Sequence, residues 1–164
     1  MLFAVATTAR TFLIPHWSRW HQAWGAPPPT VAAQWTCVRS SMFLMKALHR
    51  CGIEARLQSG QPPKQAPGIV NEDCGLFTAG GWMGHAWVEA NGFVIDITAD
   101  QFGHPPVIVA PISDPTYRPA RHEANRLTPT RNGMVVIQEI WHSWCSYVDL
   151  HCPQMAGNLG MPEG

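Results

Sequence analysis

The sequence predicts an α+β fold, in which an amphipathic helix packs against an antiparallel β-sheet. Two observations predict it: apolar and small residues recur with helical spacing over 36–51, and an Asn-Gly pair at 91–92 separates two β-rich segments. Hydrophobic residues make up 46% of the 164 residues, so the chain can bury a sizeable core. We therefore expect one domain over residues 1–164 and exclude a chain that is disordered throughout.

A tryptophan-rich segment lies near the start of the sequence. Trp17, Trp20 and Trp24 are spaced as i, i+3 and i+7, which places them on one face of a short helix over 15–25. The Gly- and Pro-rich run that follows ends this helix. We interpret residues 1–29 as a Trp-rich N-terminal arm.

The strongest helix signal lies over 36–51. Thr36 is a suitable N-cap residue, and Gly52 suits the left-handed position after the last turn. One face of this helix carries the stripe Cys37, Ser41, Leu44, Leu48 and Cys51. A short strand over 53–58 follows, and then a long irregular loop over 59–81 that is rich in Pro and Gly.

The Asn-Gly pair predicts a β-hairpin between residues 82–90 and 93–98, because Asn-Gly suits a type I′ turn. With a two-residue turn, the numbers of paired residues sum to 183. Side chains alternate between the faces of a strand, so one face of the hairpin is apolar and goes to the core. The other face carries His85 and Asp96 as diagonal neighbours, with backbones roughly 7–8 Å apart.

The remaining segments carry weaker signals. Residues 103–130 are polar and interrupted by prolines, which predicts a loop. The type of element over 134–148 stays open, since its start is β-branched but its large apolar residues have helical spacing. A flexible tail is expected over 153–164.

A histidine beside a carboxylate forms two parts of a nucleophile-activating triad, because the acid orients the imidazole and stabilises its charged form. Cys37 is the best-placed nucleophile, since the positive end of a helix dipole favours a thiolate. We therefore expect a triad of Cys37, His85 and Asp96. The alternative interpretations are a plain buried cysteine, a hydrogen-bonded structural histidine and an ordinary hairpin acid.

Three further residues are weaker candidates for the same site. An oxyanion hole needs two donors, of which the Cys37 backbone N–H is one and the Gln34 amide or the Trp35 indole N–H is the second. Packing of Trp35 at an interface and solvent exposure of Gln34 are equally good interpretations. Trp87 either forms a wall of the substrate cleft or packs in the interior.

Several motifs in this region, in the same chain order, resemble a known superfamily. They are Thr36–Met42 continuing to Cys51–Leu57, the stretch Gly-His-Ala-Trp-Val-Glu at 84–89, and Val-Ile-Asp-Ile-Thr at 94–98. Within residues 36–102 they resemble the core of the transglutaminase-like thiol enzymes, and His-Ala-Trp-Val-Glu also resembles the leader peptidases of lasso-peptide biosynthesis. The resemblance implies a papain-like fold, with a Cys-bearing helix on an antiparallel sheet. It also implies Cys37 as nucleophile, His85 as general base and acid, and Asp96 as the orienting group.

Composition argues against several other classes of protein. Eleven basic and eleven acidic residues balance, which argues against a nucleic-acid binder that works through a basic surface. No apolar run approaches the roughly 20 residues of a membrane-spanning helix. Five cysteines without a CxxC pair fit neither a disulfide framework nor a zinc knuckle. We therefore expect no metal and a reducing, cytoplasmic setting, with a secreted effector as the alternative.

The expected function is hydrolysis of an amide bond through a thioester acyl-enzyme. The bond is a peptide bond, an isopeptide bond or a glutamine side chain, so the enzyme is a protease or a deamidase with a protein or peptide substrate and no cofactor. Three alternatives stay open: transglutaminase-type acyl transfer to an amine, a non-catalytic interaction domain that retains the fold, and a metal-binding module using scattered Cys and His residues.

Overall fold

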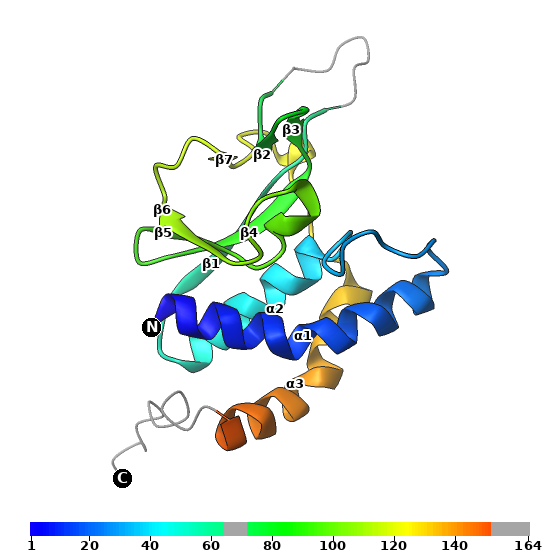
Figure 1. The fold of residues 1–164 in the computed structure, drawn as a ribbon. Coiled ribbons are helices and arrows are strands. Elements are labelled where there is room, and N and C mark those ends of the chain that lie inside the picture. Colours follow the sequence, from blue (N-terminus) through cyan, green and yellow to red (C-terminus); the bar gives the residue numbers. More distant parts are fainter. Residues whose placement is uncertain (64–71, 152–164) are drawn as a thin grey trace.

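The computed structural model describes residues 1–63 and 72–151, and it combines helices with antiparallel sheets (Figure 1). The predicted α+β class is therefore confirmed. The helices are α1 (Leu2–Trp24), α2 (Cys37–Arg50) and α3 (Arg131–His151), with short 3-10 helices η1 (Ala99–Phe102) and η2 (Glu123–Asn125). The strands are β1 (Ala55–Gly60), β2 (Gly75–Thr78), β3 (Gly81–Met83), β4 (His85–Ala90), β5 (Phe93–Asp96), β6 (Ile108–Pro111) and β7 (Tyr117–Arg118).

The larger sheet contains the predicted hairpin. Its strand order is β1-β4-β5-β6, and each neighbouring pair is antiparallel. Val88 pairs with Ile95, so the predicted register, in which paired numbers sum to 183, is confirmed. Asn91 and Gly92 have φ angles of 52° and 80°. A type I′ turn requires such positive angles at both central positions.

A smaller sheet, with the strand order β3-β2-β7, corrects two predictions. Its strand β2 comes from the predicted loop 59–81, and β3 comes from the start of the segment predicted as one strand over 82–90. The strand breaks at Gly84, after which β4 enters the larger sheet. Gly75 has a φ angle of 101°, and a Cβ there would collide with the backbone oxygen of Met83. A glycine is therefore needed for the close approach of β2 and β3.

The segment 103–130 is not the continuous loop that its prolines predict. It contributes β6 to the larger sheet, β7 to the smaller sheet and the short helix η2. Both strands lie at sheet edges, where short strands and prolines are tolerated and where periodicity is hard to detect. Residues 64–71 of the predicted loop and 153–164 of the predicted tail lie outside the described residues.

The three helices lie together on one side of the larger sheet (Figure 1). Helix α2 packs against β4 and β1, and both α1 and α3 pack against α2. The predicted apolar face of the hairpin, including Val88, Ile95 and Ile97, is buried in this main core. At the end of α2, Gly52 has the predicted left-handed conformation, with a φ angle of 71°.

Helix α1 is longer than its tryptophan spacing predicts. It begins at Leu2 rather than near residue 15, and Pro15 lies inside it. An interior proline costs about 3 kcal/mol, but Val5, Ala9 and Leu13 are fully buried in the main core. Burial of this N-terminal stripe offsets the proline and extends the helix, because apolar burial contributes about 25 cal/mol per Å².

Helix α3 contains the segment whose type the sequence left open. Residues 134–148 are helical throughout. The helical spacing identified the correct period, since Ile137, Trp144 and Val148 are buried against the main core. The β-branched residues at the start of the segment lie within the helix and do not form a strand. Val135, for example, is 48% exposed on the helix surface.

Candidate active site

A buried series of hydrogen bonds fixes the start of α2. The indole Nε1–H of Trp17 donates to Ser40 Oγ at 2.9 Å, and the Ser40 hydroxyl donates to Thr36 Oγ1 at 3.2 Å. The Thr36 hydroxyl donates to the Ala33 carbonyl at 2.7 Å, so Thr36 occupies the predicted N-cap position without capping the helix through its side chain. Cys37, the first residue of α2, is 9% exposed. As an N-terminal residue, it has a backbone N–H that the helix itself cannot satisfy.

The hairpin brings His85 and Asp96 together as its register predicts. His85 is the first residue of β4 and Asp96 is the last residue of β5. The imidazole Nε2 lies 2.6 Å from Asp96 Oδ2, and both side chains are completely buried. Asp96 Oδ1 accepts further hydrogen bonds from the Thr98 backbone N–H at 2.8 Å and from the Thr98 hydroxyl at 3.1 Å.

A tyrosine that the sequence analysis missed completes the surroundings of the carboxylate. The Tyr117 hydroxyl donates to Asp96 Oδ2 at 2.9 Å from strand β7 of the smaller sheet. Tyr117 lies in the segment predicted as a loop. An Asp-Pro turn signal stands just before it, and Asp114 indeed accepts a hydrogen bond from the Thr116 N–H at 2.9 Å. That signal points to a turn but does not identify the strand partner.

The buried pair is charged at neutral pH. Burial lowers the pKa of His85, but the Asp96 carboxylate outweighs it and, with a smaller contribution from Cys37, raises the pKa of the imidazole to about 10. Burial also tends to raise the pKa of Asp96, but the imidazolium and the hydrogen-bond donors around the carboxylate hold that pKa below its usual value. Burial and the adjacent carboxylate raise the pKa of Tyr117, so its hydroxyl stays protonated and remains a donor.

The second imidazole nitrogen is the group through which His85 can act. Nδ1 is buried and has no hydrogen-bond partner among the described residues. Cys37 lies close enough for the interaction to raise the pKa of His85, although the thiol does not complete a hydrogen bond to Nδ1. Since Asp96 occupies Nε2, Nδ1 is the nitrogen left for the thiol. The structure thus brings the three predicted residues together at the start of α2.

Gln101, which the sequence analysis also missed, connects the segment before the nucleophile to the segment after the acid. Its Oε1 accepts a hydrogen bond from the Trp35 backbone N–H at 3.2 Å, and its Nε2 donates to the Thr98 carbonyl at 2.9 Å. The short helix η1 that carries Gln101 is anchored by Arg10 of α1. The Arg10 guanidinium makes a bidentate pair with Asp100, at 2.6 and 3.0 Å. Both segments are therefore fixed by side chains from outside the triad.

Trp87 packs behind the histidine and does not wall an open cleft. Its side chain is completely buried, and its ring stacks on the His85 imidazole at a centroid distance of 6.4 Å. Phe102 contacts the same imidazole edge-on at 5.2 Å, and Tyr117 contacts Trp87 at 5.2 Å. Of the two roles considered for Trp87, interior packing is the one that its burial supports. These rings restrict the orientation of the imidazole.

Gln34 and Trp35 lie immediately before α2, but their described contacts involve other groups. The side-chain Oε1 of Gln34 accepts a hydrogen bond from the Thr30 backbone N–H at 2.9 Å. The backbone carbonyl oxygen of Gln34 lies 2.7 Å from His21 Nε2. The Trp35 side chain is 48% exposed, and its ring lies 6.0 Å from that of His21. Their role as oxyanion donors stays a prediction.

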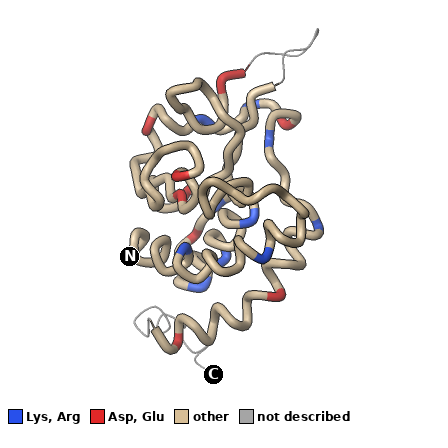
Figure 2. The backbone as a smooth tube through the Cα atoms, turned by 45° about the vertical axis from the view of Figure 1, so that its right-hand side comes forward, with Lys and Arg blue, Asp and Glu red and all other residues tan. Residues whose placement is uncertain are grey.

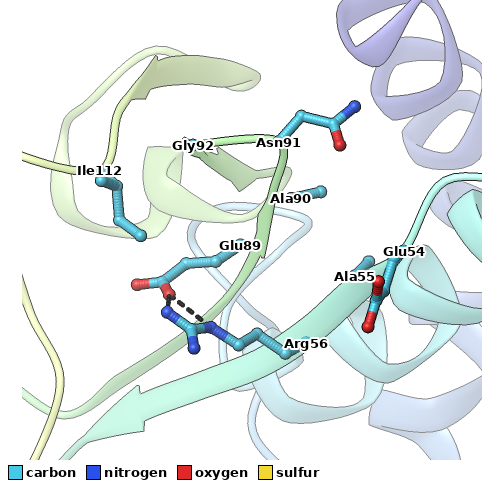
Figure 3. Close-up of a pocket in the computed structure, with 8 residues that line it drawn as sticks. All are labelled: Glu54, Ala55, Arg56, Glu89, Ala90, Asn91, Gly92 and Ile112. Carbon is cyan, nitrogen blue, oxygen red and sulfur yellow. Dashed lines mark hydrogen bonds and ion pairs between the residues drawn. The ribbon is translucent and has the colours of Figure 1, made fainter.

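The cavity drawn in Figure 3 lies toward the opposite end of β4 and has a volume of about 290 Å³. Glu89 is only 6% exposed there, but Arg56 binds its carboxylate at 2.8 and 2.9 Å, and Gln58 donates to it at 3.2 Å. Along a strand with a rise of about 3.3 Å per residue, Glu89 is about 13 Å from His85. The eight residues drawn include no Cys, Ser, Thr, Lys or His, so this cavity contains no thiol, hydroxyl or amine nucleophile and no imidazole base.

Two of the other three described cysteines are less suited to nucleophilic attack. Cys51, Cys74 and Cys145 are free thiols. Burial raises the pKa of Cys51 and also that of Cys74, which favours the unreactive thiol form of each. Cys145 is only partly buried, and the Arg50 guanidinium donates to its sulfur at 3.3 Å.

Comparisons of the chain with protein-family models, with curated proteins and with solved structures find no match in any of the three. The chemistry of the site is therefore argued from its own geometry. Within residues 1–63 and 72–151, no group of three or more His, Cys, Asp or Glu side chains is arranged to hold a metal ion. None of the described helices has both the length and the apolar character needed to cross a membrane.

Proposed function

We propose that this chain is a cysteine-dependent hydrolase of amide bonds, of the protease or deamidase type, built on a papain-like or transglutaminase-like core. One observation carries the proposal. His85 is completely buried with Nε2 held by Asp96 at 2.6 Å, whereas Nδ1 has no partner among the described residues and is left for Cys37. A buried structural histidine normally has both nitrogens satisfied. An imidazole with one nitrogen held by a carboxylate and the other free suits a general base.

In the proposed reaction, Nδ1 of His85 both accepts and donates a proton. In the proposed resting state the Cys37 proton already lies on Nδ1 of the imidazolium, and the thiolate sulfur attacks the carbonyl carbon of the amide. The C–N bond then breaks as the imidazolium returns the proton to the departing nitrogen. This leaves a thioester on Cys37 and a free amine, or ammonia when the substrate is a glutamine side chain. In the second half, Nδ1 takes a proton from water, the water oxygen attacks the thioester, and the proton passes to the departing sulfur.

Asp96 serves this mechanism by remaining ionised. Its four hydrogen-bond donors, from His85, Thr98 and Tyr117, hold the carboxylate in one orientation. The carboxylate in turn fixes which imidazole nitrogen faces the thiol and stabilises the imidazolium. The position of Cys37 at the start of α2 adds the favourable end of the helix dipole to the stabilisation of a thiolate.

Limited alkylation with iodoacetamide at pH 6.5, followed by peptide mass spectrometry, tests the thiol–imidazole pair. We expect Cys37 to be modified first although it is buried, because an imidazolium stabilises its thiolate. Cys145 is the internal reference, since it is a free thiol with greater exposure. His85→Ala should abolish the preference for Cys37. Modification of Cys145 ahead of Cys37, or a preference that survives His85→Ala, would contradict the proposal.

Turnover is tested on a proteome-derived peptide mixture, in which new termini and glutamine-to-glutamate conversion are both read by mass spectrometry. Cys37→Ala should reduce hydrolysis by at least about a thousandfold. Cys51→Ala, at the other end of the same helix, should retain it and serves as the matched control. Addition of a primary amine distinguishes hydrolysis from acyl transfer, because a transferase would incorporate the amine into the product. Undiminished hydrolysis by Cys37→Ala would exclude the proposed nucleophile.

A further inference from the structure

A cavity of about 230 Å³ lies at the start of α2, among residues that neighbour Cys37 in the chain. Trp35 and Val38, which flank Thr36 and Cys37 in the chain, both line it. The start of α2 contributes Arg39 as well, and the end of α1 contributes Trp24. The residues on both sides of Thr36 and Cys37 in the chain therefore face this cavity, which places it at the same end of α2 as the nucleophile. Its lining combines tryptophan, valine and methionine side chains with Thr128, Thr130 and one charged side chain.

Arg39 is that charged side chain, and it is held in position by aromatic rings. The guanidinium carbon lies 4.7 Å from the ring centroid of Trp24 and 5.6 Å from that of Trp20. The aliphatic stem runs past Gly133 of α3, where an added Cβ would lie 3.6 Å from Arg39 Cγ. A guanidinium that is stacked on aromatic faces keeps the N–H donors in its plane available.

These donors have no acceptor within the described part of the chain. Arg39 takes part in no described hydrogen bond or ion pair. Other basic residues of the helices differ in this respect, since Arg10 pairs with Asp100 and Arg50 pairs with Asp149. Arg39 is only partly exposed, so its guanidinium has lost part of its hydration and can gain a carboxylate partner.

Neither the cavity lining nor the two helices that carry Arg39 and its stacking tryptophans contain an acidic residue. Residues 1–53 contain no Asp or Glu, and their basic residues are Arg10, Arg19, Arg39, Lys46 and Arg50. All five lie on α1 and α2, and Figure 2 shows basic positions along these helices. Asp100 and Asp149 pair with Arg10 and Arg50, which leaves Arg19, Arg39 and Lys46 as the basic side chains of these helices with no acidic partner among the described residues. Such a surface attracts anionic groups.

We infer that this cavity is a subsite for a carboxylate of the peptide substrate, and that Arg39 binds it. The inference rests on the proposed function, which places a peptide at Cys37. An arginine fork matches a carboxylate with two parallel N–H···O bonds, which are stronger than hydrogen bonds between neutral groups. Because stacking on tryptophan already orders the guanidinium, little side-chain freedom is lost on binding. The carboxylate comes from an Asp or Glu side chain or from the C-terminus of the peptide.

Equilibrium binding to the Cys37→Ala protein tests the subsite without requiring turnover. The probe is an array of random peptides, each synthesised with a free and with an amidated C-terminus. If the carboxylate comes from a side chain, we expect the bound peptides to carry Asp or Glu at one fixed position. If it comes from the C-terminus, we expect binding to require the free C-terminal carboxylate. Replacement of that carboxylate by its amide should weaken binding about 10- to 100-fold, as loss of a charge-assisted hydrogen bond does.

The decisive comparison introduces Arg39→Gln, Arg39→Lys and Arg19→Gln separately into the Cys37→Ala protein. Arg39→Gln should remove the preference for the carboxylate over its amide, and Arg39→Lys should restore part of it. Arg19→Gln, an exposed arginine of α1, should leave the preference unchanged. A misfolded variant would lose binding of both peptides, whereas loss of the subsite changes only their ratio. Binding without a carboxylate preference, a preference that survives Arg39→Gln, or no binding by any peptide would overturn the inference.

Wild-type protein incubated with the selected peptides separates this inference from the proposed function. Cleavage or deamidation of these peptides is the expected result. If the carboxylate preference depends on Arg39 but wild-type protein leaves the peptides unchanged, the proposed function fails and the carboxylate site stands. If the protein hydrolyses peptides without regard to a carboxylate, the function stands and the inference fails.

Discussion

Strand β4 carries a pair of oppositely charged side chains toward each end, and the two pairs differ in what surrounds them. Near its start, His85 and Asp96 lie 2.6 Å apart and are both completely buried. Near its end, Glu89 and Arg56 lie 2.8 Å apart, but the arginine side chain is 68% exposed. The separations are nearly equal, so a short distance between charges does not by itself mark a functional site.

The difference lies in the groups that remain unsatisfied. Around Glu89, the carboxylate is shared by Arg56 and Gln58, and its cavity contains no nucleophile. The Asp96 carboxylate accepts hydrogen bonds from His85, Thr98 and Tyr117. The Nδ1 nitrogen of His85, in contrast, is buried and has no hydrogen-bond partner among the described residues. Satisfying the carboxylate while leaving one imidazole nitrogen free makes the first pair suited to proton transfer. The second pair is suited only to joining two strands.

Neutralising the acid of each pair gives the largest expected contrast. Asp96→Asn should reduce the rate of peptide hydrolysis by about a thousandfold or more, since the orienting and charge-stabilising group is lost. Glu89→Gln should leave that rate essentially unchanged. Initial rates on one peptide substrate measure both, with circular dichroism to verify folding. Equal losses in the two variants would show that the start of β4 has no special role.

The second largest contrast is expected in how the free energy of unfolding depends on pH, to which the His85–Asp96 pair should contribute. The pKa of His85 is about 10 when folded against an ordinary value of 6.5, so its contribution is complete below pH 6.5 and is lost as the pH rises through about 10. The loss amounts to at most about 1.4 kcal/mol per pH unit. For Asp96, whose pKa is lowered from 3.8, the contribution is present above that pH and is lost on further acidification.

Urea unfolding at pH 7 and pH 9 measures the alkaline part of this dependence. His85→Gln should remove the fall in the free energy of unfolding between the two pH values. His142→Gln, at an exposed position of α3, should retain it. A fall of the same size in the His85→Gln protein would mean that another group is responsible.

The tyrosine behind the acid should contribute a smaller amount. Tyr117→Phe removes the hydrogen bond to Asp96 Oδ2 and should lower the free energy of unfolding by about 1.5–3 kcal/mol, because the acceptor is charged. Tyr147→Phe is a matched control, since no hydrogen bond of the Tyr147 hydroxyl is described and the change should cost less than about 0.5 kcal/mol. Indistinguishable stabilities of the two variants would remove Tyr117 from the support of the acid.

Breaking the pair at the other end of β4 should have the smallest effect. Arg56→Gln should lower the free energy of unfolding by about 1 kcal/mol or less, because solvent screens an ion pair whose arginine is largely exposed. Chemical denaturation at low and high salt checks this, since raising the ionic strength should reduce the difference further. A loss as large as that of Tyr117→Phe would show that burial of Glu89 dominates the pair.

The parts of the site that depend on local patterns could be predicted. The helix over 36–51 follows from its apolar spacing, and Asn91-Gly92 determines the register that makes His85 and Asp96 diagonal neighbours. Both signals involve residues close together in the chain. They were sufficient to select the three residues that the structure brings together.

The parts that depend on distant pairing could not be predicted. Strand β7 joins β2 across about 40 residues of chain, so nothing near Tyr117 in the sequence indicates that it reaches Asp96. Gln101 likewise acts through contacts with Trp35, which is 66 residues away. The same limit applies to α1, whose extension to Leu2 depends on burial against other elements rather than on its own pattern.

The short hairpin between His85 and Asp96 also bears on the order in which the site forms. These two residues are only 11 positions apart and share a two-residue turn, so the acid and the base need little loop closure to meet. Cys37 comes from a separate helix, so its thiol meets the imidazole only once α2 packs against β4. A chain caught part-way through folding therefore carries a base without its nucleophile. Until α2 packs on β4, Cys37 lacks the imidazole that the proposed mechanism uses to activate it.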